Sequence, residues 1–272
     1  MPHLRQIEKL DALGEDAQAV FPYSIAAVRS LDVLEIDQRI TFFVGANGSG
    51  KSTVLEAIAA AASLPTVGSE EIGRDATLDA QRRLAKLFRL VWNKRTRRGF
   101  FLRAEDFFGF VRRVAQMRLE LKARLGEIAT EYRDATPLAR GLASGPVNAS
   151  LHELQARYGD DLDASSHGET FLKLFQSRSV PRGLYLMDEP EAALSPQSQL
   201  GLMALLADML RAGSQFIIAT HSPILLAYPG ACIYSFDSAP IERVDYEDLE
   251  HVSMTRSFLA DPQRYLRHIV TD

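Results

Sequence analysis

The chain has 272 residues and a formal net charge of −4, with 46% hydrophobic and 24% charged residues, as in an ordinary globular protein. No apolar run approaches the roughly 18 to 20 residues that cross a bilayer, the first residues lack the apolar core of a secretion signal, and the lone Cys232 excludes an internal disulfide or a cysteine-based metal cluster. We therefore expect a cytoplasmic protein that does not itself span a membrane.

The first predicted elements are a strand, a glycine-rich turn and a helix. Residues Ile40–Val44 form an apolar run that ends at a glycine, which is typical of a buried strand. Thr53–Ala62, rich in Ala and with Leu, Ile and Glu, predicts a helix that ends before Pro65. The turn between them reads Gly45-Ala46-Asn47-Gly48-Ser49-Gly50-Lys51-Ser52, which matches the phosphate-binding pattern G-x-x-x-x-G-K-[ST].

Each part of this P-loop pattern has a role in holding a nucleotide. Glycines let backbone N–H groups turn toward phosphate oxygens, and the helix that follows points its positive end at the anion. Lys51 places a positive charge near the β- and γ-phosphates, and the Ser52 hydroxyl is a candidate magnesium ligand. The predicted nucleotide contacts are Gly45, Asn47, Gly48, Ser49, Gly50, Lys51, Ser52 and Thr53.

The pattern changes in the middle of the chain. Leu78–Trp92 and Phe107–Tyr132 are basic and amphipathic, which predicts helices, and Gly99–Arg103 between them predicts a strand. Pro137–Ser166 contains Gly, Ser, Asn and Asp throughout, which predicts a loop. We interpret residues 66–165 as a helical subdomain inserted into an α/β core made of residues 1–65 and 166–272.

This insert is strongly basic. Between Arg74 and Arg124 there are 15 Lys/Arg and 5 Asp/Glu, a local balance of +10, so the rest of the chain carries −14. Such a cluster, with Phe88 and Trp92 interleaved, indicates an anionic partner, either a nucleic acid or an acidic protein. The alternative is an ordinary solvated helix face. The cations that supply the charge are Arg82, Arg83, Lys86, Arg89, Lys94, Arg95, Arg97 and Arg98.

The last third of the chain again alternates strands with a helix. Leu184–Met187, Phe216–Ala219 and Ile233–Phe236 predict strands, and Gln197–Arg211 predicts a helix that ends before Gly213. Strands that alternate with helices predict an α/β fold with a mostly parallel sheet flanked by helices.

Two carboxylates, Asp188 and Glu189, follow the strand Leu184–Met187. In a P-loop protein, Asp188 would hold Mg²⁺ through a water, and Glu189 would polarise the attacking water as a general base. Carboxylates are also common at strand ends that simply face solvent. The combination with the P-loop favours the functional interpretation.

Together these motifs resemble those of an ABC-type ATPase. Asp188-Glu189-Pro190 resembles the Walker B motif of that family, and Ala193-Leu194-Ser195-Pro196 its D-loop. Thr220-His221-Ser222 follows the next strand, where the family has a switch histidine. Ser166-His167-Gly168-Glu169 resembles the signature motif. The order of the motifs is that of the family, and the branch most similar is AAA_21, grouped with RecF-, SMC- and OLD-like ATPases.

The resemblance implies a P-loop NTPase that binds ATP with Mg²⁺ and hydrolyses it as an ATP-dependent head-to-tail homodimer. Lys51, Glu189 and His221 would be the catalytic residues, and Ser52 and Asp188 the metal ligands. Ser166 and Gly168 would bind the nucleotide held by the other chain, aided by the helix N-terminus behind them. What the ATP cycle works on is left open, and a link to nucleic acid or to defence is one hypothesis.

The sequence departs from the family pattern at two places. His167 stands where the signature usually has a glycine, and no glutamine follows the predicted strand Gly99–Arg103, where Glu105 is either a substitute or an ordinary solvent-facing residue. The alternative functions are the nucleotide-binding subunit of an ABC transporter that docks on a membrane permease, and a nucleotide switch without turnover. Both departures and the basic insert count against the transporter, and Glu189 counts against the switch.

Overall fold

The computed structural model describes residues 1–10, 19–67, 79–158, 167–267 and 269. Its central sheet has six strands in the order β5-β6-β7-β3-β8-β9. The first five run parallel, and β9 is antiparallel to β8. These strands are β5 (Gly99–Arg103), β6 (Leu184–Asp188), β7 (Gln215–Ala219), β3 (Ile40–Val44), β8 (Cys232–Ser235) and β9 (Glu242–Val244). The predicted mostly parallel sheet is confirmed.

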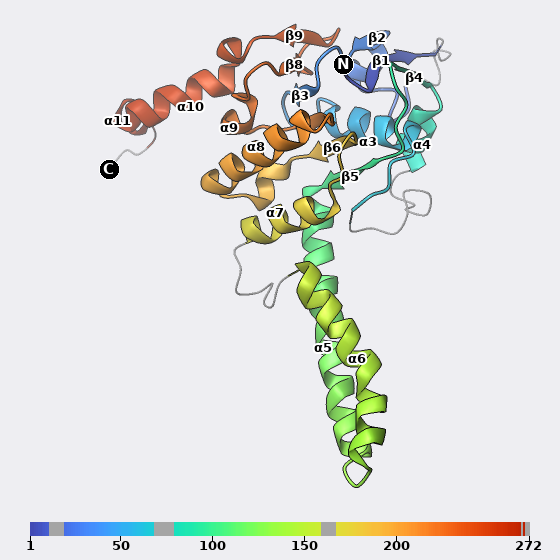
Figure 1. Cartoon of the computed structure of the whole chain (residues 1–272). Helices are drawn as coiled ribbons and strands as arrows, with labels where there is room; N and C mark the ends of the chain where they lie inside the picture. Colours follow the sequence, from blue (N-terminus) through green and yellow to red (C-terminus); the bar gives the residue numbers. More distant parts are fainter. Residues whose placement is uncertain (11–18, 68–78, 159–166, 268, 270–272) are drawn as a thin grey trace.

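The sheet is buried on both faces because its central strands are mostly apolar, with Thr41 and Gln215 as the buried polar residues of β3 and β7. All residues of β3 and β7 are buried, and the successive residues Phe42 and Phe43 belong to two different core clusters. One cluster includes α3 (Lys51–Ala61), and the other includes residues of α7 (His167–Arg178) and α8 (Pro196–Arg211). Helices therefore cover both faces, as Figure 1 shows.

A second, antiparallel sheet has the order β2-β1-β4 and comprises β1 (Leu4–Lys9), β2 (Val33–Glu35) and β4 (Phe88–Trp92). The predicted helix over residues 78–92 is therefore wrong beyond α4 (Asp79–Ala85). Phe88, Leu90 and Trp92 recur every second residue, which suits a strand, and pairing with β1 overrides the helical reading. The short helix α2 (Ala26–Ser30) precedes β2.

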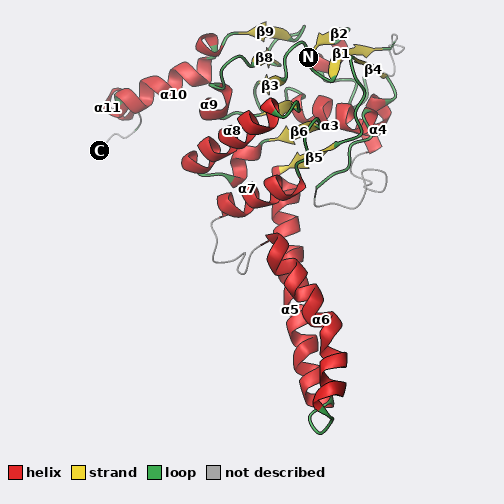
Figure 2. Cartoon of the chain, viewed as in Figure 1, coloured by secondary structure: helices red, strands yellow, loops and turns green. Residues whose placement is uncertain are grey.

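Two long helices, α5 (Ala104–Glu131) and α6 (Pro137–Tyr158), form a hairpin that projects from the body (Figures 1 and 2). The predicted loop over residues 137–166 is therefore wrong up to residue 158, and residues 159–166 lie outside the described part of the chain. Glycines and Pro146 suggested a loop, but packing along α5 stabilises the helix. Within residues 66–165, β4 and β5 pair with strands of the two sheets, so the hairpin is the part that stands apart.

Short elements complete the chain. They are the 3₁₀ turns η2 (Pro190–Ala193) and η3 (Tyr246–Asp248) and the helices α9 (Pro223–Leu226), α10 (Glu250–Ala260) and α11 (Pro262–Leu266). Among the described residues, no helix is both long and apolar enough to cross a membrane.

Candidate functional site

The predicted site residues follow the carboxyl ends of adjacent parallel strands. Gly45 follows β3, Glu189 follows β6 and Thr220 follows β7. Because these strands are neighbours in the sheet, the three loops meet at one edge, which we call the carboxyl edge. Ligands of open α/β sheets bind at such an edge.

The P-loop adopts a backbone that its glycines make accessible. Gly48 and Gly50 have φ angles of +83° and +105°, in the left-handed region that favours glycine. Gly50 is the N-cap of α3 and makes no side-chain cap hydrogen bond. The first N–H groups of a helix have no partner within the helix, and they are suited to phosphate oxygens.

Lys51 is folded back into this loop. Its side chain is buried, and Nζ donates hydrogen bonds to the carbonyls of Gly45 at 2.7 Å and Ala46 at 3.0 Å. Burial lowers the pKa of Lys51, and the nearby carboxylates of Glu189 and Asp188 oppose that change. A phosphate would offer this ammonium a charged acceptor, which is a stronger partner than a carbonyl.

The two predicted metal ligands are in contact. Ser52 Oγ donates a hydrogen bond to Asp188 Oδ1 at 3.1 Å. Burial raises the pKa of Asp188 to about 7, although Ser52 and Lys51 act in the opposite direction. A hydroxyl and a carboxylate are hard oxygen ligands, which fit Mg²⁺. The described residues contain no cluster of three acidic, His or Cys side chains that would hold a metal alone, so water and phosphate oxygens would complete the shell.

Glu189 and His221 face each other across the ends of β6 and β7. His221 Nε2 lies 3.7 Å from Glu189 Oε1, and both side chains are partly exposed. Glu189 has a left-handed backbone (φ 49°, ψ 48°), and its N–H donates to the carbonyl of Ala219 at 2.9 Å. Burial and the charge of Lys51 lower the pKa of His221, which favours the neutral imidazole.

Sequence reasoning missed the residues that hold His221 in place. The buried carboxylate of Glu191 accepts a hydrogen bond from the backbone N–H of His221 at 2.6 Å. Ser222 donates from Oγ to Gln199 Oε1, and Gln199 Nε2 donates to the carbonyl of Leu194 at 3.3 Å. The switch loop is therefore tied to both the Walker B and the D-loop segments. The signal for Glu191 was a third carboxylate two residues after Glu189.

A second missed group lies beside Asp188. Arg103 ends β5 directly opposite Asp188 in the strand register and is almost fully buried. It pairs with Glu56 at 3.3 Å and with Asp106 at 2.8 Å. Glu105 also pairs with Arg103, at 3.3 Å, but 74% of its side chain is exposed, as expected for a solvent-facing residue.

Asp237 was also missed. It follows β8, and its Oδ1 accepts a hydrogen bond from the N–H of Ala46 at 2.6 Å. A carboxylate therefore braces the first turn of the P-loop from the neighbouring strand. Nothing in the sequence pattern alone marks this aspartate.

The signature segment is described only in part. Ser166 lies outside the described residues, and His167 is the first residue of α7. Gly168 packs against the start of α8, where a Cβ on this glycine would lie 2.4 Å from Ser198 Oγ. Ser195, in the D-loop, caps the same helix by accepting from the N–H of Ser198 at 3.1 Å. The signature and D-loop segments are thus direct neighbours.

A phosphate loop, a hydroxyl–carboxylate pair and a strand-end glutamate at the carboxyl edge of a mostly parallel sheet define a P-loop nucleotide-binding protein. The chain belongs to the AAA_21 family, described as "AAA domain, putative AbiEii toxin, Type IV TA system", whose model matches residues 89–227. Residues 23–86 match a second model, AAA_23, described as "AAA domain". The search of curated proteins found no match.

Several solved structures are similar to the chain at low sequence identity. An ATP-binding cassette from an ABC transporter is 17% identical, with all of both chains covered and a TM-score of 0.45. The Smc head domain from Pyrococcus furiosus is 12% identical over 95% of this chain and 100% of that chain, with a TM-score of 0.46. CbiO1 from Clostridium perfringens is 15% identical over 99% and 100%, also with a TM-score of 0.46.

Proposed function

We propose that this protein binds ATP with Mg²⁺ and hydrolyses it at the carboxyl edge of its central sheet. The observation that carries the proposal is the 3.1 Å contact between Ser52 and Asp188, directly beside the buried Lys51. A buried lysine and a buried carboxylate are both costly to charge in isolation, which favours a site built for a metal–phosphate ligand.

Each residue has a role in this proposal. Lys51 and the N–H groups at the start of α3 bind phosphate oxygens, and Ser52 and Asp188 hold Mg²⁺. Mg²⁺ would supply charge neutralisation on the phosphate oxygens. Glu189 accepts the proton of the attacking water, and its left-handed backbone keeps the carboxylate at the end of β6. His221 orients that water or the phosphate, with its backbone fixed by Glu191.

The catalytic unit in this proposal is an ATP-dependent homodimer. The contact of Gly168 with Ser198 places the signature and D-loop segments next to each other on one surface. Ser166 and Gly168 would cover the nucleotide bound by the other chain, together with the N-terminus of α7. One chain alone would leave its P-loop nucleotide open on one side.

The substitution Glu189→Gln tests both parts of the proposal. We expect it to lower ATP turnover by about 10³-fold or more, because a general base is lost, and to trap an ATP-bound dimer visible by light scattering. Glu127→Gln is the matched control, because this exposed glutamate lies on the hairpin that projects from the body (Figure 1). Turnover that survives in Glu189→Gln would disprove the assignment of the base, and a variant that stays monomeric with ATP would disprove the dimer.

For the process coupled to ATP hydrolysis, our hypothesis is a link to an anionic partner, either a nucleic acid or an acidic protein, or to defence. The family description names a toxin of a type IV toxin–antitoxin system, which supports including defence. No observation among the described residues favours the alternative of a transporter subunit docked on a membrane permease. Co-purification with a permease would favour it.

A further inference from the structure

A second charged surface lies at the opposite edge of the central sheet, where the parallel strands begin. Four segments meet there, one before each of β3, β5, β6 and β7. They are Asp37–Arg39, Asn93–Arg98, Arg178–Gly183 and Arg211–Ser214. They are far apart in the sequence, and the parallel strand order brings them together. We call this the amino edge.

Hydrogen bonds hold these segments side by side. Thr96 Oγ1 donates to the carbonyl of Arg182 at 3.1 Å, which joins the loop before β5 to the loop before β6. The buried His3 places one ring nitrogen 3.3 Å from the carbonyl of Lys94 and the other 3.0 Å from the carbonyl of Gly213. The backbone at the amino edge is therefore fixed, and the side chains project from a firm base.

The amino edge is strongly basic and largely unpaired. The four segments contain eight Lys/Arg and one Asp. That aspartate, Asp37, pairs with Arg243 at 3.4 Å, and Arg211 pairs with Asp208. The other seven cations are exposed and form no ion pair with any described residue. These amino-edge cations are Arg39, Lys94, Arg95, Arg97, Arg98, Arg178 and Arg182.

The rest of the basic insert is not equivalent. Arg89 pairs with Glu8, Arg103 is buried among carboxylates, and Arg124 pairs with Glu127 at 2.8 Å. The local balance of +10 seen in the sequence is therefore divided among ion pairs, exposed positions of the hairpin such as Arg112 and Arg113, and the exposed loop before β5. Arg39, Arg178 and Arg182, which lie outside residues 74–124, join that loop only in the folded chain.

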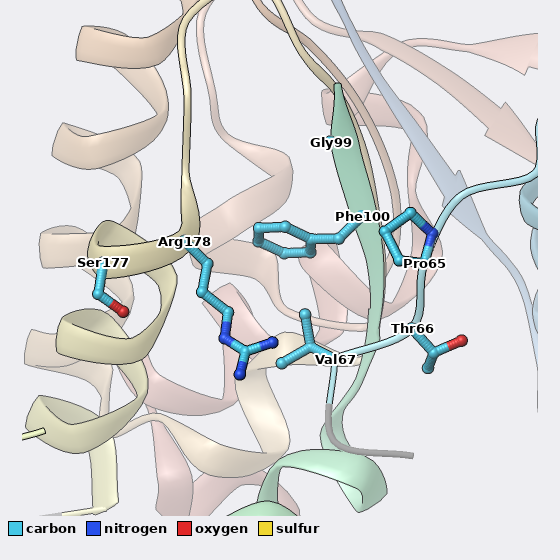
Figure 3. Close-up of a pocket in the computed structure, with 7 residues that line it drawn as sticks. All are labelled: Pro65, Thr66, Val67, Gly99, Phe100, Ser177 and Arg178. Carbon is cyan, nitrogen blue, oxygen red and sulfur yellow. The ribbon is translucent and has the colours of Figure 1, made fainter. Parts of the chain in front are cut away.

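The chemistry of this surface fits phosphates. Six of the seven cations are arginines, whose planar fork binds phosphate oxygens in pairs. Within the four segments, Val180, which is 42% exposed, is the large hydrophobic residue at the surface. Interfaces with protein partners usually have an apolar centre, which this surface does not provide. A cavity of about 370 Å³ opens beside Arg178, and Figure 3 shows the guanidinium pointing past Phe100 toward Val67.

We propose that the amino edge binds the sugar–phosphate backbone of a nucleic acid, on the side of the sheet opposite to the nucleotide site. Contacts to the backbone carry no sequence information by themselves, so the binding is tolerant of sequence. This surface requires neither ATP nor dimerisation, so it stands or falls independently of the proposed hydrolysis.

The test measures binding of the full chain to a labelled 25-base-pair DNA duplex and to a single-stranded RNA of the same length, by fluorescence anisotropy between 50 and 200 mM salt. In the variant Arg39→Gln/Arg95→Gln/Arg97→Gln/Arg182→Gln, we expect affinity at 50 mM salt to fall by about tenfold or more. The slope of log K against log salt for the duplex should become shallower by about 3.6 if all four cations contact phosphates, since each phosphate contact contributes roughly 0.9.

The matched control removes four charges elsewhere, with Arg112→Gln/Arg113→Gln/Lys122→Gln/Arg133→Gln on exposed hairpin positions. It should keep the affinity within about twofold of the parent chain. Equal losses in both variants would overturn the proposal, because they would report net charge alone. So would a parent chain that binds neither probe at 50 mM salt. Competition by poly-glutamate as strong as that by the duplex would assign the surface to an acidic protein instead.

Discussion

The two edges of the central sheet differ in the burial and pairing of their charged side chains. At the carboxyl edge, charged groups lie close to one another, and the cations are buried: Lys51 lies near Asp188 and Glu189, and Arg103 lies among Glu56 and Asp106. At the amino edge, seven cations stand exposed without carboxylate partners among the described residues. Burial makes a charge sensitive to every neighbour, whereas an exposed charge costs the fold little.

Because the charged groups of the two edges differ in burial and pairing, one sheet can provide two separate binding surfaces. Folding the carboxyl edge costs free energy because burial disfavours the ionised carboxylates, as the raised pKa values of Asp188, Glu191 and Glu56 indicate. Such a site gains when a ligand supplies the missing charge. The exposed cations of the amino edge produce a positive electrostatic potential that attracts a polyanion, and they do not change the packing of the core.

The largest effect is expected from the buried cation at the carboxyl edge. Arg103→Met leaves Glu56 and Asp106 buried without their cation, which should cost about 3–5 kcal/mol of unfolding free energy. Urea unfolding followed by circular dichroism measures the loss. The double variant Arg103→Met/Glu56→Gln should recover part of it. A loss below about 1 kcal/mol in the single variant would show that the pair is solvated in solution.

Lys51→Met should separate ligand binding from folding. The buried ammonium is replaced by an apolar side chain, so the thermal midpoint without nucleotide should stay the same or rise. The affinity for ATP with Mg²⁺ should fall by about 100-fold or more, because the phosphate cation is lost, and the midpoint shift induced by ATP should disappear. Differential scanning fluorimetry reports both quantities. An undiminished ATP-induced shift would contradict the assignment of Lys51 to the phosphates.

The raised pKa of Asp188 predicts a pH dependence of stability in the absence of nucleotide and metal. With a folded-state pKa of about 7, above the ordinary value, the native state binds the extra proton, so its stability is full near pH 4 and declines as pH rises through 7. Asp188→Asn removes this contribution and should raise the thermal midpoint at pH 8 by on the order of 5 °C. A parent chain and variant with parallel pH profiles would refute the assignment.

The smallest effect is expected at the amino edge. Arg39→Gln/Arg182→Gln changes two exposed cations that have no ion-pair partner among the described residues. The unfolding free energy should therefore stay within about 0.5 kcal/mol of the parent chain, and the affinity for ATP should not change. Urea unfolding and nucleotide titration check this. A loss as large as that of Arg103→Met would mean that the two edges are not energetically distinct.

Motif spacing predicted much of the carboxyl edge from the sequence. Apolar runs that end at Gly45, Asp188 and Thr220 marked three buried strands, and parallel strands place such ends together. The contact of Ser52 with Asp188 links residues 136 positions apart, and it follows from that placement. Glu191, Gln199 and Asp237 could not be found in this way, because their roles depend on which backbone group each one faces.

Local patterns failed where tertiary pairing or packing decides the conformation. Phe88–Trp92 has apolar residues that fit a helix or a strand, and pairing with β1 makes it a strand. Residues of α6 include glycines and a proline that favour a loop, yet contact with α5 makes them helical. In both cases the deciding partner is distant in the chain or stabilises through burial.

The phosphate loop, the strand-end carboxylates and the order of the motifs can be recognised from the sequence alone, because each depends on residues close together in the chain. The division of charged side chains between buried pairs and exposed surface is visible only in the folded chain. Folding buries Arg103 beside Asp188, and it gathers Arg39, Arg95 and Arg182 at the opposite edge. The physical reason is that burial and charge pairing depend on neighbours across the sheet, which composition and periodicity cannot report.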